Sequence, residues 1–193
     1  MTTVTFTALC GLIGVERLLE LAWSRAHERR NAARGGQIVP ERGFSAMALL
    51  HVATLVCAPV EAWLRSSPPP LWLSLPSLVA MAAATALRIW ALSTLGDAWS
   101  VRVTRFPPDR PRPVVSRGPY RYIRHPNYLA VILELLALPL LGGAWLTAIG
   151  ATLANVVVLS RRIPLEEREL MISETYRREM GNKPRFWPAG GRG

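Results

Sequence analysis

The segment 117–128 concentrates the side chains of this sequence that are best suited to bind a charged small molecule. It reads Arg-Gly-Pro-Tyr-Arg-Tyr-Ile-Arg-His-Pro-Asn-Tyr and leads into an almost wholly apolar stretch, 127–141. Pro126 favours an extended residue before it and suits the first position of a helix. Free N–H groups at that helix start could bind a carboxylate, with Arg121 or Arg124 as its charged partner. An aromatic side chain of the segment could cover an adenine or a sulfonium group.

A second polar cluster, 161–167, follows the next apolar stretch, 144–160. Arg162 and Glu166 are four residues apart on one helix, which allows a mutual ion pair. The same spacing allows a clamp in which the arginine binds an acidic substrate and the carboxylate binds an amine. In a third interpretation these arginines simply hold lipid phosphates. If Gly142-Gly143 joins two short helices as a hairpin, both polar clusters emerge at one membrane face and meet over a cofactor.

Composition indicates a membrane protein rather than a nucleic-acid-binding protein. The chain has 193 residues, is 50% hydrophobic and carries a formal net charge of +10. Its basic residues fall mainly in the gaps between apolar stretches, as in the cytoplasmic loops of membrane proteins. No cysteine–histidine spacing indicates a metal site. We therefore expect one all-α integral membrane domain over residues 1–193, whose partners are membrane lipid and a lipidic small molecule.

Five apolar stretches predict about five transmembrane helices, at 2–23, 44–64, 71–95, 127–141 and 144–160. The last two are shorter than the roughly 20 residues of a straight crossing, which favours a tucked or tilted hairpin. Residues 164–180 predict a cytoplasmic C-terminal helix, because Pro164 suits its first turn and Gly181 suits its end.

The distribution of arginine predicts the orientation in the membrane. With the N-terminus outside and the C-terminus cytoplasmic, all arginine-rich segments fall on one side: 25–42, 99–124 and 161–192. We expect the inner membrane of a bacterium. The residues 99–104 alternate in polarity, as in a short strand or an extended lid.

Several charged residues fall inside the predicted spans, where they are costly unless paired or facing a polar cavity. Glu16 and Glu20 share a helix face beside Arg17, as an ion pair near the headgroups or as a polar wall of the substrate cavity. Glu134, two turns into the fourth span, allows a structural or a functional interpretation.

Two further residues in the spans have competing interpretations. His51 allows a packing role or a place in the substrate cavity. Arg88 is close enough to a helix end to reach the cytoplasmic interface with its guanidinium.

The combined motifs resemble the isoprenylcysteine carboxyl methyltransferase family over about residues 95–188. That resemblance implies a small membrane enzyme that binds S-adenosyl-L-methionine in a cytoplasmic pocket. The motifs are Gly118-x-Tyr120-x-x-x-Arg124-His125-Pro126-x-Tyr128, an apolar hairpin, and Arg162-Ile-Pro-x-Glu166-Glu167.

Roles follow from the resemblance position by position. Arg162 and Glu166 match the family's reaction centre, where the lipid meets the methyl group. Glu167 matches the second acid of that motif and is expected at the cofactor site. The remaining positions expected to bind the cofactor are Gly118, Tyr120, Arg124, His125, Pro126, Tyr128 and Leu129. The expected substrate cavity comprises Glu16, Glu20, His51 and Glu134.

The N-terminal half resembles a bacterial branch of this family, on Glu16-Arg17-Leu18-x-Glu20-Leu21, Gly43-Phe44-x-x-Met47 and Leu50-His51. Some members of that branch are associated with type III polyketide synthases and methylate alkylpyrone or alkylresorcinol hydroxyls. The predicted reaction is therefore O-methylation of a lipidic acceptor, either a prenylcysteine-type carboxylate or a ring hydroxyl. A carboxylate is already ionised, whereas a phenol with a pKa of about 10 needs a base, for which Glu166 is the nearest candidate.

Three alternatives remain open from the sequence. The same fold could methylate a phospholipid or an isoprenoid. A similar helical architecture could house a nicotinamide-dependent membrane reductase, which needs phosphate-binding positions. A basic scaffold could gather anionic lipid without catalysis, and would show no saturable binding of S-adenosylmethionine. The sequence makes no prediction of the oligomeric state.

Overall fold

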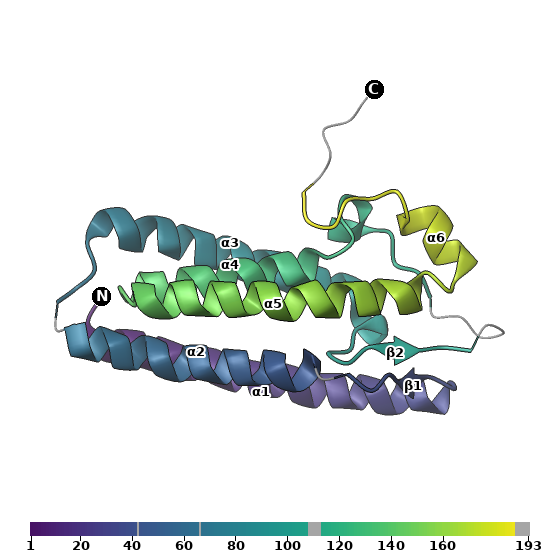
Figure 1. Ribbon diagram of the computed structural model, residues 1–193, viewed down its shortest axis with the longest axis horizontal. Helices are drawn as coiled ribbons and strands as arrows, with labels where there is room; N and C mark the ends of the chain where they lie inside the picture. The colour runs from purple at the N-terminus through teal and green to yellow at the C-terminus, as the bar shows by residue number, and fades with distance from the viewer. Residues whose placement is uncertain (42, 66, 108–112, 188–193) are drawn as a thin grey trace, which may run out of the picture.

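Five long helices lie along one axis, and the short elements gather at one end of the bundle (Figure 1). The computed structural model describes residues 1–41, 43–65, 67–107 and 113–187, so the predicted cofactor-binding half, 95–188, is described except for 108–112 and 188. The long helices are α1 (Thr3–Ala33), α2 (Gly43–Arg65), α3 (Leu71–Leu95), α4 (Pro126–Leu141) and α5 (Trp145–Leu170). The short ones are η1 (Gly96–Ala98), β1 (Gln37–Ile38), β2 (Thr104–Arg105), η2 (Gly118–Arg121) and α6 (Glu174–Met180). The predicted all-α class is confirmed.

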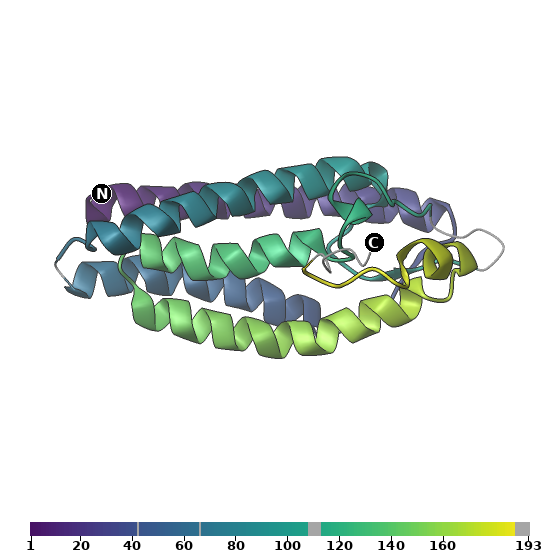
Figure 2. The same cartoon turned by 90° about the horizontal axis from the view of Figure 1, so that it is seen from above.

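Helix α4 lies between α3 and α5, while α1 and α2 form the other layer (Figures 1 and 2). This central position explains why most α4 side chains are buried although the helix has only 16 residues. Pro126 occupies its first turn, where the missing N–H costs nothing. Gly142 follows α4 where the ring of Phe6 packs, and a side chain there would collide with that ring. The last two long helices form the expected hairpin; α4 is its short, central member, whereas α5, with 26 residues, is longer than the predicted span 144–160.

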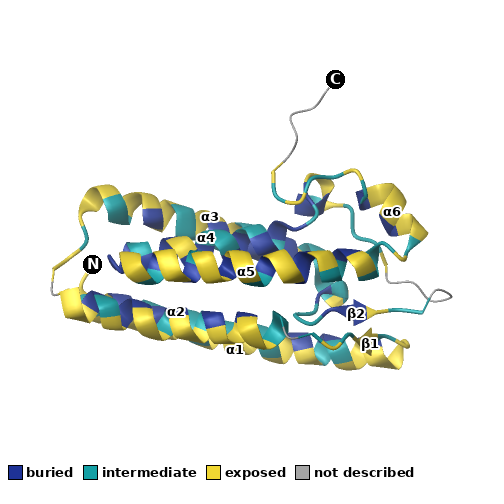
Figure 3. Cartoon of the chain, in the orientation of Figure 1, coloured by how far each residue is buried: buried dark blue, intermediate teal, exposed yellow. Residues whose placement is uncertain are grey.

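The outer faces of the helices are apolar and exposed (Figure 3). Three segments are long and apolar enough to cross a membrane, Gly43–Arg65, Leu71–Ala98 and Trp145–Leu170, yet only 22%, 22% and 33% of their most apolar windows is buried. Exposed apolar surface on this scale is stable in contact with lipid tails rather than water. The chain is thus a helical membrane protein.

The connections divide between the two ends of the bundle. The links α1–α2 and α3–α4 lie with α6 at one end, and the links α2–α3 and α4–α5 lie at the other (Figure 1). The predicted arginine-rich segments consequently share one end, as the proposed topology requires. Which end faces the cytoplasm stays a prediction.

Helix α1 is longer than the predicted first span. Its 31 residues measure about 46 Å, which exceeds the roughly 30 Å hydrocarbon core, so the helix continues into the region expected to be a basic loop. The loop begins only after Ala33, where Gly35 adopts a positive φ of 88°. The buried side chains Ser24 and His27 hold this extension against the rest of the protein.

The predicted C-terminal helix is present, but its predicted start at residue 164 was wrong. Helix α5 continues through Pro164 to Leu170, and α6 is a separate seven-residue helix capped by Ser173. A proline inside a helix removes one hydrogen bond. Packing compensates here, because Ile163 and Glu167, on either side of Pro164, are both buried.

Candidate functional site

One cavity of about 770 Å³ runs from the short elements into the bundle. Its polar end is lined by side chains from α4, the end of α5 and α6. Its other arm runs between α1 and α2 and is mainly apolar, with Gly14, Leu18, Val52, Leu55 and Val56 on its wall. A cavity of this kind can hold a polar group at one end and a hydrocarbon chain at the other.

The two polar clusters meet at the hydroxyl of Tyr128. That hydroxyl donates to Glu166 over 2.5 Å and accepts from Arg162 Nε over 2.8 Å. Tyr128 lies in the first turn of α4, and the other two residues lie near the end of α5. Arg162 and Glu166 are thus joined through Tyr128, rather than only by their spacing along one helix.

Arg162 is buried and is held by groups that the sequence did not indicate. Its Nη2 donates to the carbonyl oxygen of Val101 and lies 3.5 Å from Glu41 Oε1. Glu41 also accepts from the backbone N–H of Val103 over 3.3 Å. In the sequence Glu41 is one of two acids, with Glu28, in the basic segment 25–42. Together these contacts fix the guanidinium against the cavity wall.

His125 is positioned by the second acid of the α5 motif. Its Nε2 lies 3.0 Å from Glu167 Oε1, and Glu167 also accepts two hydrogen bonds from Arg185, of 3.0 and 2.7 Å. These hydrogen bonds raise the pKa of the Arg185 guanidinium above its ordinary value. The backbone N–H groups of Arg124 and His125 donate to the carbonyls of Pro184 and Arg185, over 2.9 and 3.0 Å. The C-terminal segment therefore closes onto the start of α4.

Several buried polar atoms at this end lack a hydrogen-bond partner among the described residues. Three of them belong to residues that line the cavity: Arg124 Nε, Asn127 Oδ1 and Arg162 Nη1. Buried polar groups are normally paired, so such atoms mark places where a ligand can bind. Two arginine donors suit a carboxylate, and an amide oxygen suits an ammonium or a hydroxyl group.

The structure brings most of the predicted site residues to one cavity, though not all. Those on its wall are Tyr120, Arg124, His125, Tyr128, Arg162, Glu166, Glu20 and His51. Those outside its lining are Gly118, Pro126, Leu129, Glu167, Glu16 and Glu134. Gly118 packs against α3 instead, where an added Cβ would lie 2.6 Å from Thr94 Oγ1. Its φ of 58° also favours glycine, so its role is in the turn itself.

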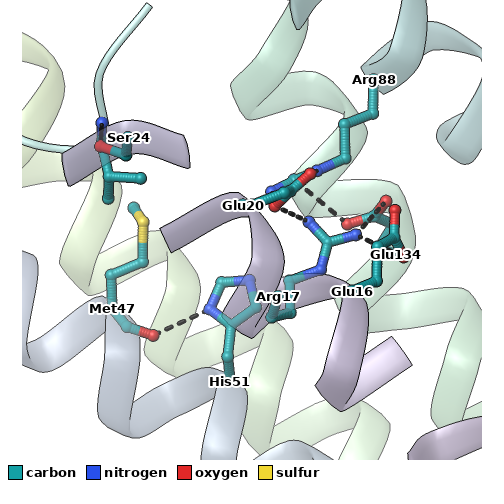
Figure 4. A network of polar contacts seen from close by, with 9 residues as sticks. Glu16, Arg17, Glu20, Ser24, Met47, His51, Arg88 and Glu134 are labelled. Atoms are coloured by element: carbon teal, nitrogen blue, oxygen red, sulfur yellow. Dashed lines mark hydrogen bonds and ion pairs between the residues drawn. The ribbon is translucent and has the colours of Figure 1, made fainter. Parts of the chain in front are cut away.

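The acids of the spans form an ion network with two arginines (Figure 4). Arg17 lies 2.8 Å from Glu20, 3.3 Å from Glu16 and 3.5 Å from Glu134. Arg88 lies 2.5 Å from Glu20 and 3.4 Å from Glu134. The network thus joins α1, α3 and α4 inside the bundle.

This network corrects two expectations. Arg88 is buried and does not reach the interface. Glu16 and Glu134, expected in the substrate cavity, lie beyond its wall because their carboxylates are turned toward Arg17 and Arg88. Glu134 therefore has a structural role. The network members Arg17, Glu20 and Arg88 also line the cavity.

The segment that follows η1 covers the polar end of the cavity. Of the predicted strand 99–104, only Thr104 lies in a strand: β2 pairs with β1, where Ile38 lies opposite Thr104, whereas Val101 and Arg102 form a bend. His27 Nδ1 lies 2.9 Å from the carbonyl oxygen of Trp99, and Ser24 accepts from the N–H of Val101 over 2.8 Å. The extension of α1 thus supports the segment that holds Arg162.

The apolar arm opens toward the surrounding lipid. Leu18, Val52 and Val56 line the cavity and are also 67%, 59% and 56% exposed on the outer surface of α1 and α2. A ligand with a long apolar chain can therefore reach the polar end sideways from the bilayer.

Fold and cavity together define a helical membrane protein with a polar binding site at one end of its bundle. The sequence model of the isoprenylcysteine carboxyl methyltransferase family matches residues 77–172. The uncharacterized protein YpbQ of Bacillus subtilis is 30% identical over 166 residues, which cover 86% of this chain and 96% of that protein. An uncharacterized protein of Haemophilus influenzae is 27% identical over 169 residues, covering 85% and 91%.

The fold is also similar to a solved structure. The eukaryotic intramembrane Ras methyltransferase, an isoprenylcysteine carboxyl methyltransferase, superposes with a TM-score of 0.57 at 20% identity. The match covers 74% of this chain and 52% of that protein, so the chain spans about half the length of the eukaryotic enzyme. The chain belongs to the isoprenylcysteine carboxyl methyltransferase family, and its general class is that of the membrane methyltransferases.

Proposed function

We propose that this protein is an S-adenosyl-L-methionine-dependent O-methyltransferase whose acceptor is a lipid. The observation that carries the proposal is a cavity of about 770 Å³ with two unlike ends. Its polar end joins the motifs of α4 and α5 through Tyr128, and its apolar arm opens between α1 and α2. A water-soluble donor and a lipidic acceptor can meet in such a cavity.

The polar end suits the amino-acid part and the aromatic base of the cofactor. The unpaired donors of Arg124 and Arg162 can bind a carboxylate, and the amide oxygen of Asn127 can accept from an ammonium group. Tyr120 and Tyr176 are buried aromatic residues on the same wall and can pack against the adenine ring. When bound, the cofactor supplies an electrophilic methyl group on a positively charged sulfur.

The chain's own residues supply alignment and charge. Arg162 is held by Val101 and Tyr128, so its guanidinium can orient an anionic acceptor oxygen without reorganising. For a hydroxyl acceptor, the Glu166 carboxylate would take the O–H proton as that oxygen accepts the methyl group that the cofactor would supply. Binding both reactants in one cavity supplies the proximity that the transfer needs.

Two measurements test the proposal. Calorimetry with S-adenosylhomocysteine and the purified protein in detergent should show saturable binding at one site per chain. Incubation with labelled S-adenosylmethionine and extracted lipids, followed by mass spectrometry, should reveal one class of lipid that gains a methyl group. Folded protein without saturable binding would contradict the proposal.

The same proposal places the polar end of the bundle on the cytoplasmic side of a bacterial inner membrane, where the cofactor is made. The arginine-rich segments at that end support this orientation. Reporter fusions at the two termini should show the N-terminus outside and the C-terminus in the cytoplasm. The reverse result would leave the site on the wrong side of the membrane for its cofactor.

A further inference from the structure

His51 stands out on the wall of the cavity as a polar residue that the ion network does not include. Its Nδ1 lies 2.8 Å from the carbonyl oxygen of Met47, one turn earlier in α2 (Figure 4). A carbonyl oxygen accepts hydrogen bonds, so Nδ1 carries the proton. In the neutral ring Nε2 is then a hydrogen-bond acceptor. The Met47 bond therefore fixes the tautomer as well as the orientation of the ring.

His51 lies farther along α2 than the residues at the proposed point of methyl transfer. Met47 packs in one cluster with Tyr128 and Ile163, so it lies beside the residues that join the two polar motifs. His51 follows Met47 by four residues, which is about 6 Å along the helix. His51 therefore lies about one helical turn from the residues that join the two polar motifs.

The residues around His51 leave its ring available to contact a ligand. The neighbouring charged residues pair with one another: Glu20 lies 2.8 Å from Arg17 and 2.5 Å from Arg88. The nearby cavity wall is otherwise apolar, with Val52, Leu55 and Val131. A polar group of a ligand in this arm would thus find an oriented hydrogen-bond acceptor beside charges that already pair with one another, and a bond to such a buried group discriminates between ligands.

We infer that His51 is a specificity-determining residue: through Nε2 it accepts a hydrogen bond from a second hydroxyl group of the lipid acceptor, one helical turn deeper than the oxygen that is methylated. The inference rests on the proposed function and narrows its acceptor. As an acceptor, Nε2 would pair with a donor, which the second hydroxyl group of a ring supplies and a carboxylate does not. The apolar chain of that ring would continue toward Val56 and the lipid.

The test compares two acceptors that differ by one hydroxyl group. An alkylresorcinol carries two ring hydroxyls, and the alkylphenol of equal chain length carries one. The wild type should prefer the resorcinol by about tenfold to a hundredfold in kcat/KM, the range expected for one hydrogen bond to a buried group. His51→Leu should remove this preference by lowering kcat/KM for the resorcinol, with the value for the phenol within about twofold of wild type.

Two further variants separate recognition from folding. His51→Gln keeps an acceptor atom near the same place and should retain part of the preference. Thr54→Val is the matched control, because Thr54 also bonds a carbonyl one turn earlier, that of Leu50, but lies outside the lining of this cavity. It should leave the preference unchanged.

Several outcomes would overturn the inference. Equal losses for both lipids in His51→Leu would mean that His51 acts on the reacting oxygen or only on the fold. A preference that survives in His51→Leu would place the second hydroxyl elsewhere. If neither ring lipid is methylated while a prenylcysteine is, the inference fails and the proposed methyl transfer stands. Absence of S-adenosylhomocysteine binding would instead refute the proposed function itself.

Discussion

The hydroxyl of Tyr128 lies 2.5 Å from a carboxylate oxygen of Glu166, although the two residues are 38 positions apart in the chain. The same hydroxyl accepts a hydrogen bond from Arg162. One atom therefore connects the first turn of α4 to the last turns of α5. This contact brings the two predicted polar clusters to the end of the cavity where we propose that methyl transfer takes place.

Tyr128→Phe removes this connection while keeping the aromatic ring. We expect kcat to fall about tenfold to a hundredfold, because Arg162 and Glu166 lose their shared partner and with it their alignment. Affinity for S-adenosylhomocysteine should change less than kcat. Calorimetry and a radiolabel transfer assay measure the two quantities on the same preparation, and unchanged turnover would show that the contact does not position the reacting groups.

Arg162→Lys keeps the positive charge beside Glu41 but removes the planar fork that contacts Tyr128 and Val101. We expect turnover to fall by a factor of about a hundred or more while most cofactor affinity remains, since a lysine cannot reproduce several oriented donors. Arg162→Ala should also destabilise the protein, because Glu41 is then left as a buried, uncompensated charge. Near-normal methylation by the lysine variant would rule out an orienting role.

Substitution of His125 tests the cofactor site directly. His125→Ala should weaken binding of S-adenosylhomocysteine about tenfold, because the ring lines the cavity and packs near Tyr128, with ring centroids 5.4 Å apart. A matched variant, Arg30→Ala, removes an exposed pair with Asp97 outside the cavity lining and should leave the affinity unchanged. Equal affinities of wild type and His125→Ala by calorimetry would remove His125 from the site.

The ion network predicts a stability effect that should be separable from activity. Arg88→Met leaves Glu20 and Glu134 without one of their two arginines, and we expect a loss of about 3–5 kcal/mol in unfolding free energy. Adding Glu20→Met should recover part of that loss, because the double variant no longer buries the unpaired acid. Thermal unfolding in detergent checks this, and additive losses in the double variant would argue against a coupled network.

Much of this protein could be predicted from its sequence because lipid imposes strong and local rules. Apolar stretches must become helices, and arginines must collect beyond their ends, so the helical class and the sharing of one end by the basic segments followed from composition alone. The pairing of the motif around His125 with that around Glu167 also followed, since a short hairpin returns its two ends to one face.

Long-range packing decided the rest, because no local pattern shows which distant groups will become neighbours. Nothing near Pro164 indicated that α5 would continue through it, and nothing near Arg88 indicated that Glu20 and Glu134 would bury it. The contacts of Arg162 with Glu41 and Val101 likewise form only once α1, α2 and the segment after η1 have assembled. Sequence therefore determined which residues carry charge into the membrane, and tertiary structure decided whether each faces the cavity or a counter-ion.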